Sequence, residues 1–259
     1  MAEVYERIRW NVANGVVTAT LDRPAKRNAL DARTVAELTD AVLTFGGDDD
    51  ARVMVLRGNG PDFCAGADLD QLEHIAATSD PLTNLDDAMA LGRLFIRMRR
   101  TDKPIVAAVH GHAIAGGAGL ATACDLIIAS ESARFGYPEV HLGFVPAMVA
   151  ALLRRSLGEK RIFELITLGG RFTAQEAHAM GLVARVVPDA EFDSAVAGFA
   201  AELAARSASA VRLCKRLLYG IDGLAFEDAI ARAAEINVIA RATPDCQAGV
   251  RRFIEKSGE

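Results

Sequence analysis

Residues 104–125 read PIVAAVHGHAIAGGAGLATACD, and this stretch decides the fold that we predict for the chain. Pro104 is followed by the apolar run IVAAV, which is typical of a strand buried on both faces. The glycine run that follows leads into GLATACD, which we expect to form a helix. A buried strand joined to a helix by a short glycine loop is typical of a parallel α/β sheet.

The same alternation extends outward from this stretch through about residue 188. An Asn14-Gly15 turn predicts a hairpin near the start, and a long helical region is expected to break at Ser79-Asp80-Pro81. From residue 188 onward the sequence is helical, with Pro244 as the main interruption. We therefore expect an α/β fold with a core over residues 1–195 and a helical C-terminal region over residues 196–259.

Composition excludes several functional classes. The 259 residues are 51% hydrophobic and 24% charged, which is enough for a full core, and the net charge is −5. An acidic balance argues against a protein that binds nucleic acid through its phosphates. The four cysteines form no CxxC pair, no apolar run is long enough to span a membrane, and the first ten residues carry charges. We expect a cytoplasmic protein with reduced thiols that binds neither membranes nor nucleic acid.

Common catalytic motifs are absent. Gly117 and Gly119 begin a GxG, but the third glycine of a dinucleotide-binding fingerprint would fall on Thr122. The sequence has no GKS, GKT or GxSxG. His110 and His112 could share one face of a strand, but no third ligand lies at metal spacing, so packing or surface roles are expected. We predict no metal and no separate cofactor.

Two glycine loops, CAGADL at 64–69 and AGGAGL at 115–120, each follow an apolar strand and precede an expected helix. The first turn of a helix has N–H groups without partners, and glycine or alanine lets a ligand oxygen approach them. Two such loops could together donate two N–H groups to one carbonyl oxygen, an arrangement that stabilises an enolate or a tetrahedral oxyanion. Either loop by itself is also explained by close packing of helix on strand.

Glu139 lies between Pro138 and an apolar stretch. A carboxylate among apolar neighbours has a raised pKa, because desolvation disfavours its charged form, and this suits a general acid or base near neutral pH. A glutamate in a surface loop is the other interpretation. Combined with the two glycine loops, Glu139 indicates proton transfer next to a carbonyl group.

At this point the sequence resembles the crotonase, or enoyl-CoA hydratase/isomerase, superfamily. The resemblance covers nearly the whole chain, in order: LDRPAKRNALD, FCAGADL, KPIVAAVHGHAIAGGAGLATACDLIIASESARFGYPEVHLGFVP, GGRFTAQEAHAMGLVARVVP and RRFIEK. It implies a spiral of strand-strand-helix turns, followed by helices that assemble the chain into a trimer or a hexamer.

The resemblance also implies a substrate and a set of contacts. Family members bind acyl-CoA thioesters, so coenzyme A would be part of the substrate, and the oxyanion-hole amides would be those of Ala67 and Gly116. The residues implied to contact coenzyme A are Lys26, Arg27, Ala29, Leu30, Ala65, Ala67, Asp68, Leu69 and, from a neighbouring subunit, Phe253 and Lys256. The acyl pocket would be lined by Leu72, Ile75, Met89, Phe144 and Met148, although most such positions could be purely structural.

One position departs from the family pattern. The two-glutamate hydratases of the family have one glutamate that matches Glu139 and another that falls on Gly119 here. Three hypotheses follow: hydration of a 2-enoyl-CoA with Glu139 as sole acid and base, isomerisation of a 3-enoyl-CoA to a 2-enoyl-CoA by Glu139, or a CoA-binding or scaffold protein with little activity. Asp68, His112 and His141 are candidates to replace the missing carboxylate, although Asp68 is more typical of a residue that supports its loop.

Overall fold

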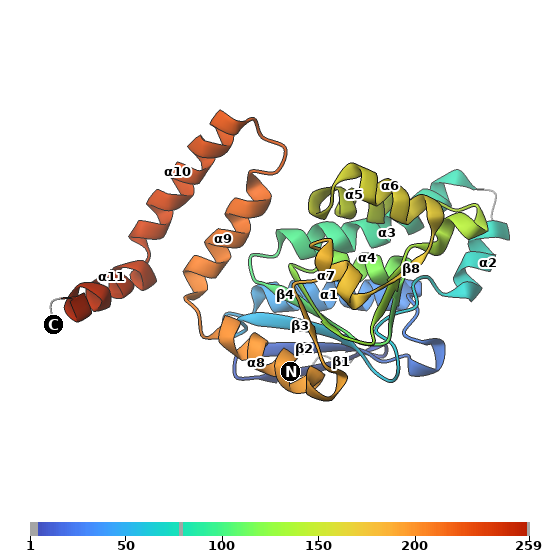
Figure 1. Ribbon diagram of the computed structural model, residues 1–259, viewed down its shortest axis with the longest axis horizontal. Coiled ribbons are helices and arrows are strands. Elements are labelled where there is room, and N and C mark those ends of the chain that lie inside the picture. Colours follow the sequence, from blue (N-terminus) through green and yellow to red (C-terminus); the bar gives the residue numbers. More distant parts are fainter. Residues whose placement is uncertain (1–4, 78–79, 258–259) are drawn as a thin grey trace.

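Six strands form the main sheet, in the order β1-β2-β3-β4-β6-β9. The computed structural model describes residues 5–77 and 80–257 (Figure 1). The strands are β1 (Ile8–Ala13), β2 (Val16–Leu21), β3 (Val53–Gly58), β4 (Ile105–Val109), β6 (Leu126–Ser130) and β9 (Arg185–Val187). Only the β1–β2 pair, the hairpin predicted at Asn14-Gly15, is antiparallel, and the other neighbours in this sheet are parallel. The prediction of a largely parallel α/β sheet is confirmed.

Strand β4 shows why the apolar run after Pro104 is continuous. Ile105, Ala107 and Val109 pack into one hydrophobic cluster, and Val106 and Ala108 pack into a second cluster on the opposite face. Successive side chains of a strand point to opposite faces, so a strand covered on both sides requires apolar residues at every position.

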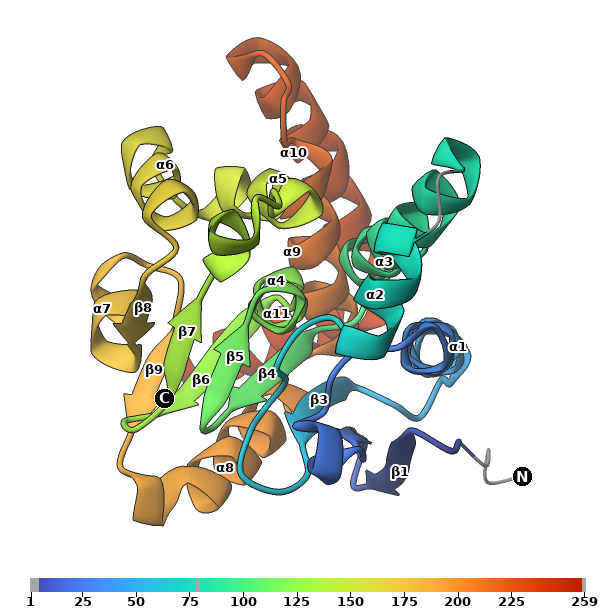
Figure 2. The ribbon, with the colours of Figure 1, turned by 90° about the vertical axis from the view of Figure 1, so that its right-hand side faces the viewer.

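Helices cover both faces of this sheet (Figure 2). On one face lie α1 (Ala32–Gly47), α3 (Pro81–Arg100) and α4 (Gly116–Ala123), and on the other lies α8 (Phe192–Ala204). The boundary expected after residue 195 falls inside α8, which packs on the sheet through Phe192, Val196 and Ala200. The remaining core elements are η1 (Pro24–Lys26), α2 (Leu69–Ala77), η2 (Pro138–Leu142), α5 (Ala147–Ser156), α6 (Glu159–Leu168), α7 (Ala174–Ala179) and η3 (Asp189–Glu191).

A second sheet has three strands, and one of them leads into the glycine-rich turn. Its strands are β5 (His112–Ile114), β7 (Arg134–Gly136) and β8 (Arg171–Thr173), in the order β5-β7-β8. Strand β5 runs directly into the turn before α4, and β7 runs directly into the segment that holds Glu139. Because β5 and β7 are paired, these two segments begin side by side.

The last three helices form an arm that extends from the core: α9 (Ala208–Gly220), α10 (Phe226–Ala242) and α11 (Pro244–Ser257) (Figure 1). Its first helix is fixed by buried polar contacts. Lys215 Nζ donates hydrogen bonds to Met98 O, Lys103 O and Asp125 Oδ2, and Tyr219 OH donates to Asp125 Oδ1 at 2.6 Å. Burial lowers the pKa of Lys215, and the Asp125 carboxylate opposes that shift. The base of the arm is therefore joined to the core through paired charges.

Candidate active site

The two glycine loops meet in space. Leu30 N donates to Gly66 O and Asp68 N donates to Leu30 O, so the first loop pairs with the 27–30 segment. The second loop lies against the first: a methyl group placed on Gly116 would lie 3.9 Å from Ala67 N. The two amides predicted to form an oxyanion hole are thus neighbours.

The backbone at both loops has unusual conformations. Gly66 has φ +94°, and a Cβ there would lie 2.8 Å from Ile114 O, so only glycine fits without strain. Ala115, directly before α4, has φ +51° and ψ −124°, a region that an alanine rarely adopts. Its N–H donates to Gly136 O at 2.8 Å, which ties this turn to the end of β7. Strain at such positions is typical of sites where backbone groups are aimed at a ligand.

The two amides are available to a ligand. Within the described residues, neither Ala67 N nor Gly116 N donates a hydrogen bond to the protein. Gly116 is the first residue of α4, whose N-terminal N–H groups lie at the positive end of the helix dipole. This arrangement suits an oxygen atom that gains negative charge.

Glu139 lies in η2, immediately after β7. Its side chain is half-buried, and its Oε2 is a buried oxygen without a hydrogen-bond partner among the described residues. Burial raises the pKa of Glu139, and a hydrogen bond from its own N–H offsets only part of that shift. A half-buried carboxyl group with one oxygen unpaired has the properties of a proton carrier.

The space beside Gly119 is filled with hydrocarbon. A methyl group at this position would lie 2.5 Å from Val149 Cγ2 on α5 and 3.4 Å from Phe95 Cζ on α3. Ordinary carbon–carbon contacts are about 3.5–4.0 Å, so no side chain fits at residue 119 while Val149 keeps its position. Nothing in the sequence pattern indicates that Val149 and Phe95 fill this space.

The other candidates to replace the missing carboxylate are engaged elsewhere. Asp68 is buried and pairs with Arg23 at 2.7 Å. Burial by itself would raise the pKa of Asp68, but the hydrogen bond from Arg23 holds it below the usual value. His112 Nδ1 lies 2.6 Å from Asp62 Oδ1, and His141 Nε2 lies 3.3 Å from Gly169 O. Asp68 is paired within the protein, whereas the Glu139 carboxyl group keeps a buried oxygen without a hydrogen-bond partner among the described residues.

The residues predicted to contact coenzyme A divide into two groups. The 26–30 and 65–69 segments lie together, with Ala65 N donating to Arg27 O at 3.0 Å. Lys26 Nζ pairs with Asp70 Oδ2 at 2.9 Å on the exposed surface, and Leu69 is 75% exposed. Phe253 and Lys256 are on α11, at the opposite end of the molecule from α2 (Figure 1). Within one chain, Phe253 and Lys256 therefore do not reach the site, and their predicted role requires a neighbouring subunit.

The residues predicted to line the acyl pocket come from three helices and from the loop that follows η2. Leu72 lies on α2 and Met89 on α3, and the two helices are joined by a 2.5 Å hydrogen bond from Gln71 Nε2 to Asp87 Oδ1. Met148 Cγ lies 3.7 Å from the position of a Cβ on Gly92, which places α5 against α3. Phe144 is 57% exposed, just beyond η2. Ile75 lies on α2, but its side chain is outside the described residues.

Histidines do not form a metal centre in the described part of the chain, where no group of three or more His, Cys, Asp or Glu side chains is arranged to hold a metal ion. His110 Nε2 lies 2.8 Å from Gly60 O, and His112 pairs with Asp62. The four cysteines are free.

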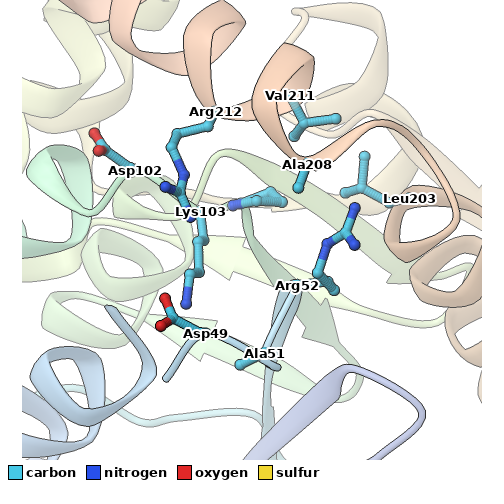
Figure 3. A pocket seen from close by; sticks show the side chains of 10 residues that line it. Asp49, Ala51, Arg52, Asp102, Lys103, Leu203, Ala208, Val211 and Arg212 are labelled. Carbon is cyan, nitrogen blue, oxygen red and sulfur yellow. The ribbon is translucent and has the colours of Figure 1, made fainter. Parts of the chain in front are cut away.

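A small pocket of about 70 Å³ lies elsewhere, between the base of the arm and the core (Figure 3). None of the predicted site residues lines it. Its lining residues are Asp49, Ala51, Arg52, Asp102, Lys103, Pro104, Leu203, Ala208, Val211 and Arg212. Lys103 Nζ donates to the carbonyl oxygens of Phe45 and Asp48, and Arg52 donates to Arg206 O. The Arg52 contact joins the core to the segment before α9, and the Lys103 contacts lie within the core. The catalytic candidates lie at Glu139 and the glycine loops instead.

In the described residues an α/β fold holds two neighbouring backbone amides without hydrogen-bond partners and a half-buried carboxyl group, an arrangement that suits an enzyme acting beside a carbonyl group. The sequence model of the enoyl-CoA hydratase/isomerase family matches residues 11–258, and the chain belongs to this family, the crotonase superfamily. In the described residues, no helix combines the length and apolar character needed to cross a membrane.

Relatives and solved structures agree with this assignment. The chain is 40% identical over 241 residues to a Thermus thermophilus protein named "Putative enoyl-CoA hydratase", covering 93% of this chain and 95% of that protein. It is 34% identical to the 2,3-dehydroadipyl-CoA hydratase of Escherichia coli, covering 93% and 92%. The crystal structure of enoyl-CoA hydratase from Mycobacterium smegmatis superimposes with a TM-score of 0.92 at 31% identity, covering 96% of each chain. The expected crotonase fold is confirmed.

Proposed function

We propose that this enzyme adds water to the double bond of a 2-enoyl-CoA and forms a 3-hydroxyacyl-CoA, with Glu139 as its only acid and base. The observation that carries the proposal is the pair of neighbouring amides, Ala67 N and Gly116 N, in a fold that also holds a half-buried carboxyl group with a raised pKa. The names of several relatives as hydratases support the same reaction.

In the proposed mechanism the thioester oxygen accepts hydrogen bonds from Ala67 N and Gly116 N. The Glu139 carboxylate accepts a proton from water as the water oxygen bonds to C3 of the substrate. Electrons of the double bond then move toward the thioester, and the resulting enolate is stabilised by the two amides. Glu139 returns the proton to C2, so the same face of the double bond receives both groups. The addition is therefore syn, and Glu139 ends in its starting state.

Isomerisation of a 3-enoyl-CoA to a 2-enoyl-CoA is the second candidate function. The filled space at Gly119 supports it, because that space has no room for a second carboxyl group. Glu139 would remove a proton from C2 and return it to C4, so a second carboxyl group is unnecessary. A CoA-binding protein without catalysis is disfavoured, because it has no need for an unpaired, half-buried carboxyl group.

Product analysis separates these reactions. Incubation with crotonyl-CoA in D₂O is expected to give 3-hydroxybutyryl-CoA with one deuterium at C2. Incubation with 3-hexenoyl-CoA is the matched test for double-bond migration. Migration without any 3-hydroxyacyl product would identify an isomerase, and tight acyl-CoA binding without turnover would identify a binding protein.

We also propose that the enzyme works as a trimer or a trimer-based hexamer. The arm carries exposed apolar side chains, including Phe226 at 75% and Ile254 at 63% exposure. In such an assembly Phe253 and Lys256 would reach the coenzyme A of a neighbouring subunit, and coenzyme A would enter only as part of the substrate. A molar mass in solution near the 27.5 kDa of one chain would contradict the assembly.

A further inference from the structure

Gly119 and Val149 are in close contact across the interface between α4 and α5. A Cβ on residue 119 would lie 2.5 Å from Val149 Cγ2 but 3.6 Å from Val149 Cβ. The conflict is therefore with the branch of the valine and not with the α5 backbone. Both residues are buried, and Val149 is 3% exposed.

We propose that Val149 is a specificity-determining residue, because its side chain occupies the space that an acidic side chain at position 119 would need. This rests on the proposed function of Glu139. With Val149 in place, the space beside position 119 is filled by Val149 and Phe95, so the site has Glu139 and no carboxyl group at position 119. The site is then restricted to reactions that a single carboxylate performs. The absence of a second acid is built into the packing of α4 on α5 and does not depend on residue 119 alone.

The packing is tested first, without any measurement of activity. Gly119 lies inside a helix at a conformation without positive φ, where alanine is ordinarily favoured over glycine. We nevertheless expect Gly119→Ala to lower Tm by about 3 °C or more, because the new methyl group collides with Val149.

In a Val149→Ala background the same Gly119→Ala change is expected to leave Tm unchanged or to raise it, because the nearest α5 carbon is then at 3.6 Å. The loss of Tm that is expected with Val149 present should thus disappear or change sign in the Val149→Ala background. An equal loss of Tm in both backgrounds would overturn the proposal.

The role in specificity is tested by the pH dependence of crotonyl-CoA hydration. The variant Gly119→Glu/Val149→Ala is expected to gain a second ionisation at low pH, and the matched variant Gly119→Gln/Val149→Ala is expected to keep one. Identical profiles for these two folded variants would overturn the role of Val149 in specificity. If the wild-type enzyme has no activity on enoyl-CoAs, the proposed function fails, while the Tm comparison still decides whether Val149 closes position 119.

Discussion

Glu139→Gln is expected to lower kcat for crotonyl-CoA hydration by about 10³-fold while KM changes little. Glutamine has nearly the same shape as glutamate, but it cannot accept a proton from water or return one to C2. The proposed coenzyme A contacts lie on the 26–30 and 65–69 segments and do not include Glu139 in η2, so we expect binding to be retained. Steady-state kinetics measure kcat and KM, and calorimetric titration with an acyl-CoA measures binding.

The stability of this variant provides its control. Burial raises the pKa of Glu139 in the folded state, so its contribution to stability decreases as pH rises through that pKa. Removing the carboxylate is therefore expected to leave Tm at neutral pH unchanged or higher. A folded Glu139→Gln enzyme with wild-type kcat would show that another group transfers the proton.

Gly116→Pro is expected to lower kcat by about 10²- to 10³-fold, the effect of losing one oxyanion-hole donor. Proline has no N–H, and its φ is compatible with the first position of a helix, which Gly116 occupies in α4. The substitution would thus remove the proposed hydrogen bond to the thioester oxygen, at a helical position where proline is ordinarily accepted. Single-turnover rates with saturating crotonyl-CoA measure the loss in the chemical step.

Gly116→Ala is the matched control because it keeps the N–H. A Cβ at this position would lie 3.8 Å from Leu30 Cδ1 and 3.9 Å from Ala67 N, which are ordinary contacts. We expect this variant to retain most of the wild-type kcat. Equal losses in the alanine and proline variants would indicate a steric effect and would argue against Gly116 N as an oxyanion donor.

Much of the fold was predictable because burial leaves a clear pattern in the sequence. The uninterrupted run IVAAV indicated a strand covered on both faces, and β4 has side chains in both hydrophobic clusters. Aspartate is a common N-cap, and the Asp31 side chain, directly before α1, accepts a hydrogen bond from Thr34 N. These features depend on residues close together in the chain.

The second sheet was not predicted, since β5, β7 and β8 have only three residues each and show no periodicity. Similarly, nothing in the sequence of residues 112–116 indicates that Ala115 adopts a positive φ. This conformation is imposed by the pairing of β5 with β7 and by the hydrogen bond to Gly136. The glycine loops and Glu139 could be identified from the sequence as candidate functional residues. Their arrangement in space, however, depends on contacts between segments that are far apart in the chain.

Position 119 shows the same limit within the site. The resemblance to the family marks Gly119 as the position where its two-glutamate hydratases are expected to have an acid, but it does not indicate which side chains fill the space. Val149 is 30 residues further along the chain, and only the packing of α5 on α4 brings its side chain to Gly119.

The pH dependence of kcat/KM for crotonyl-CoA tests most directly the claim that a single carboxylate moves the proton. Glu139 must be ionised to accept a proton from water, so activity should fall as pH falls through its pKa, which burial places above the ordinary value of 4.5. The account predicts one ionisation on the acid side, with a slope of about one and a midpoint above 4.5. A slope of about two would require a second carboxyl group and would contradict the account.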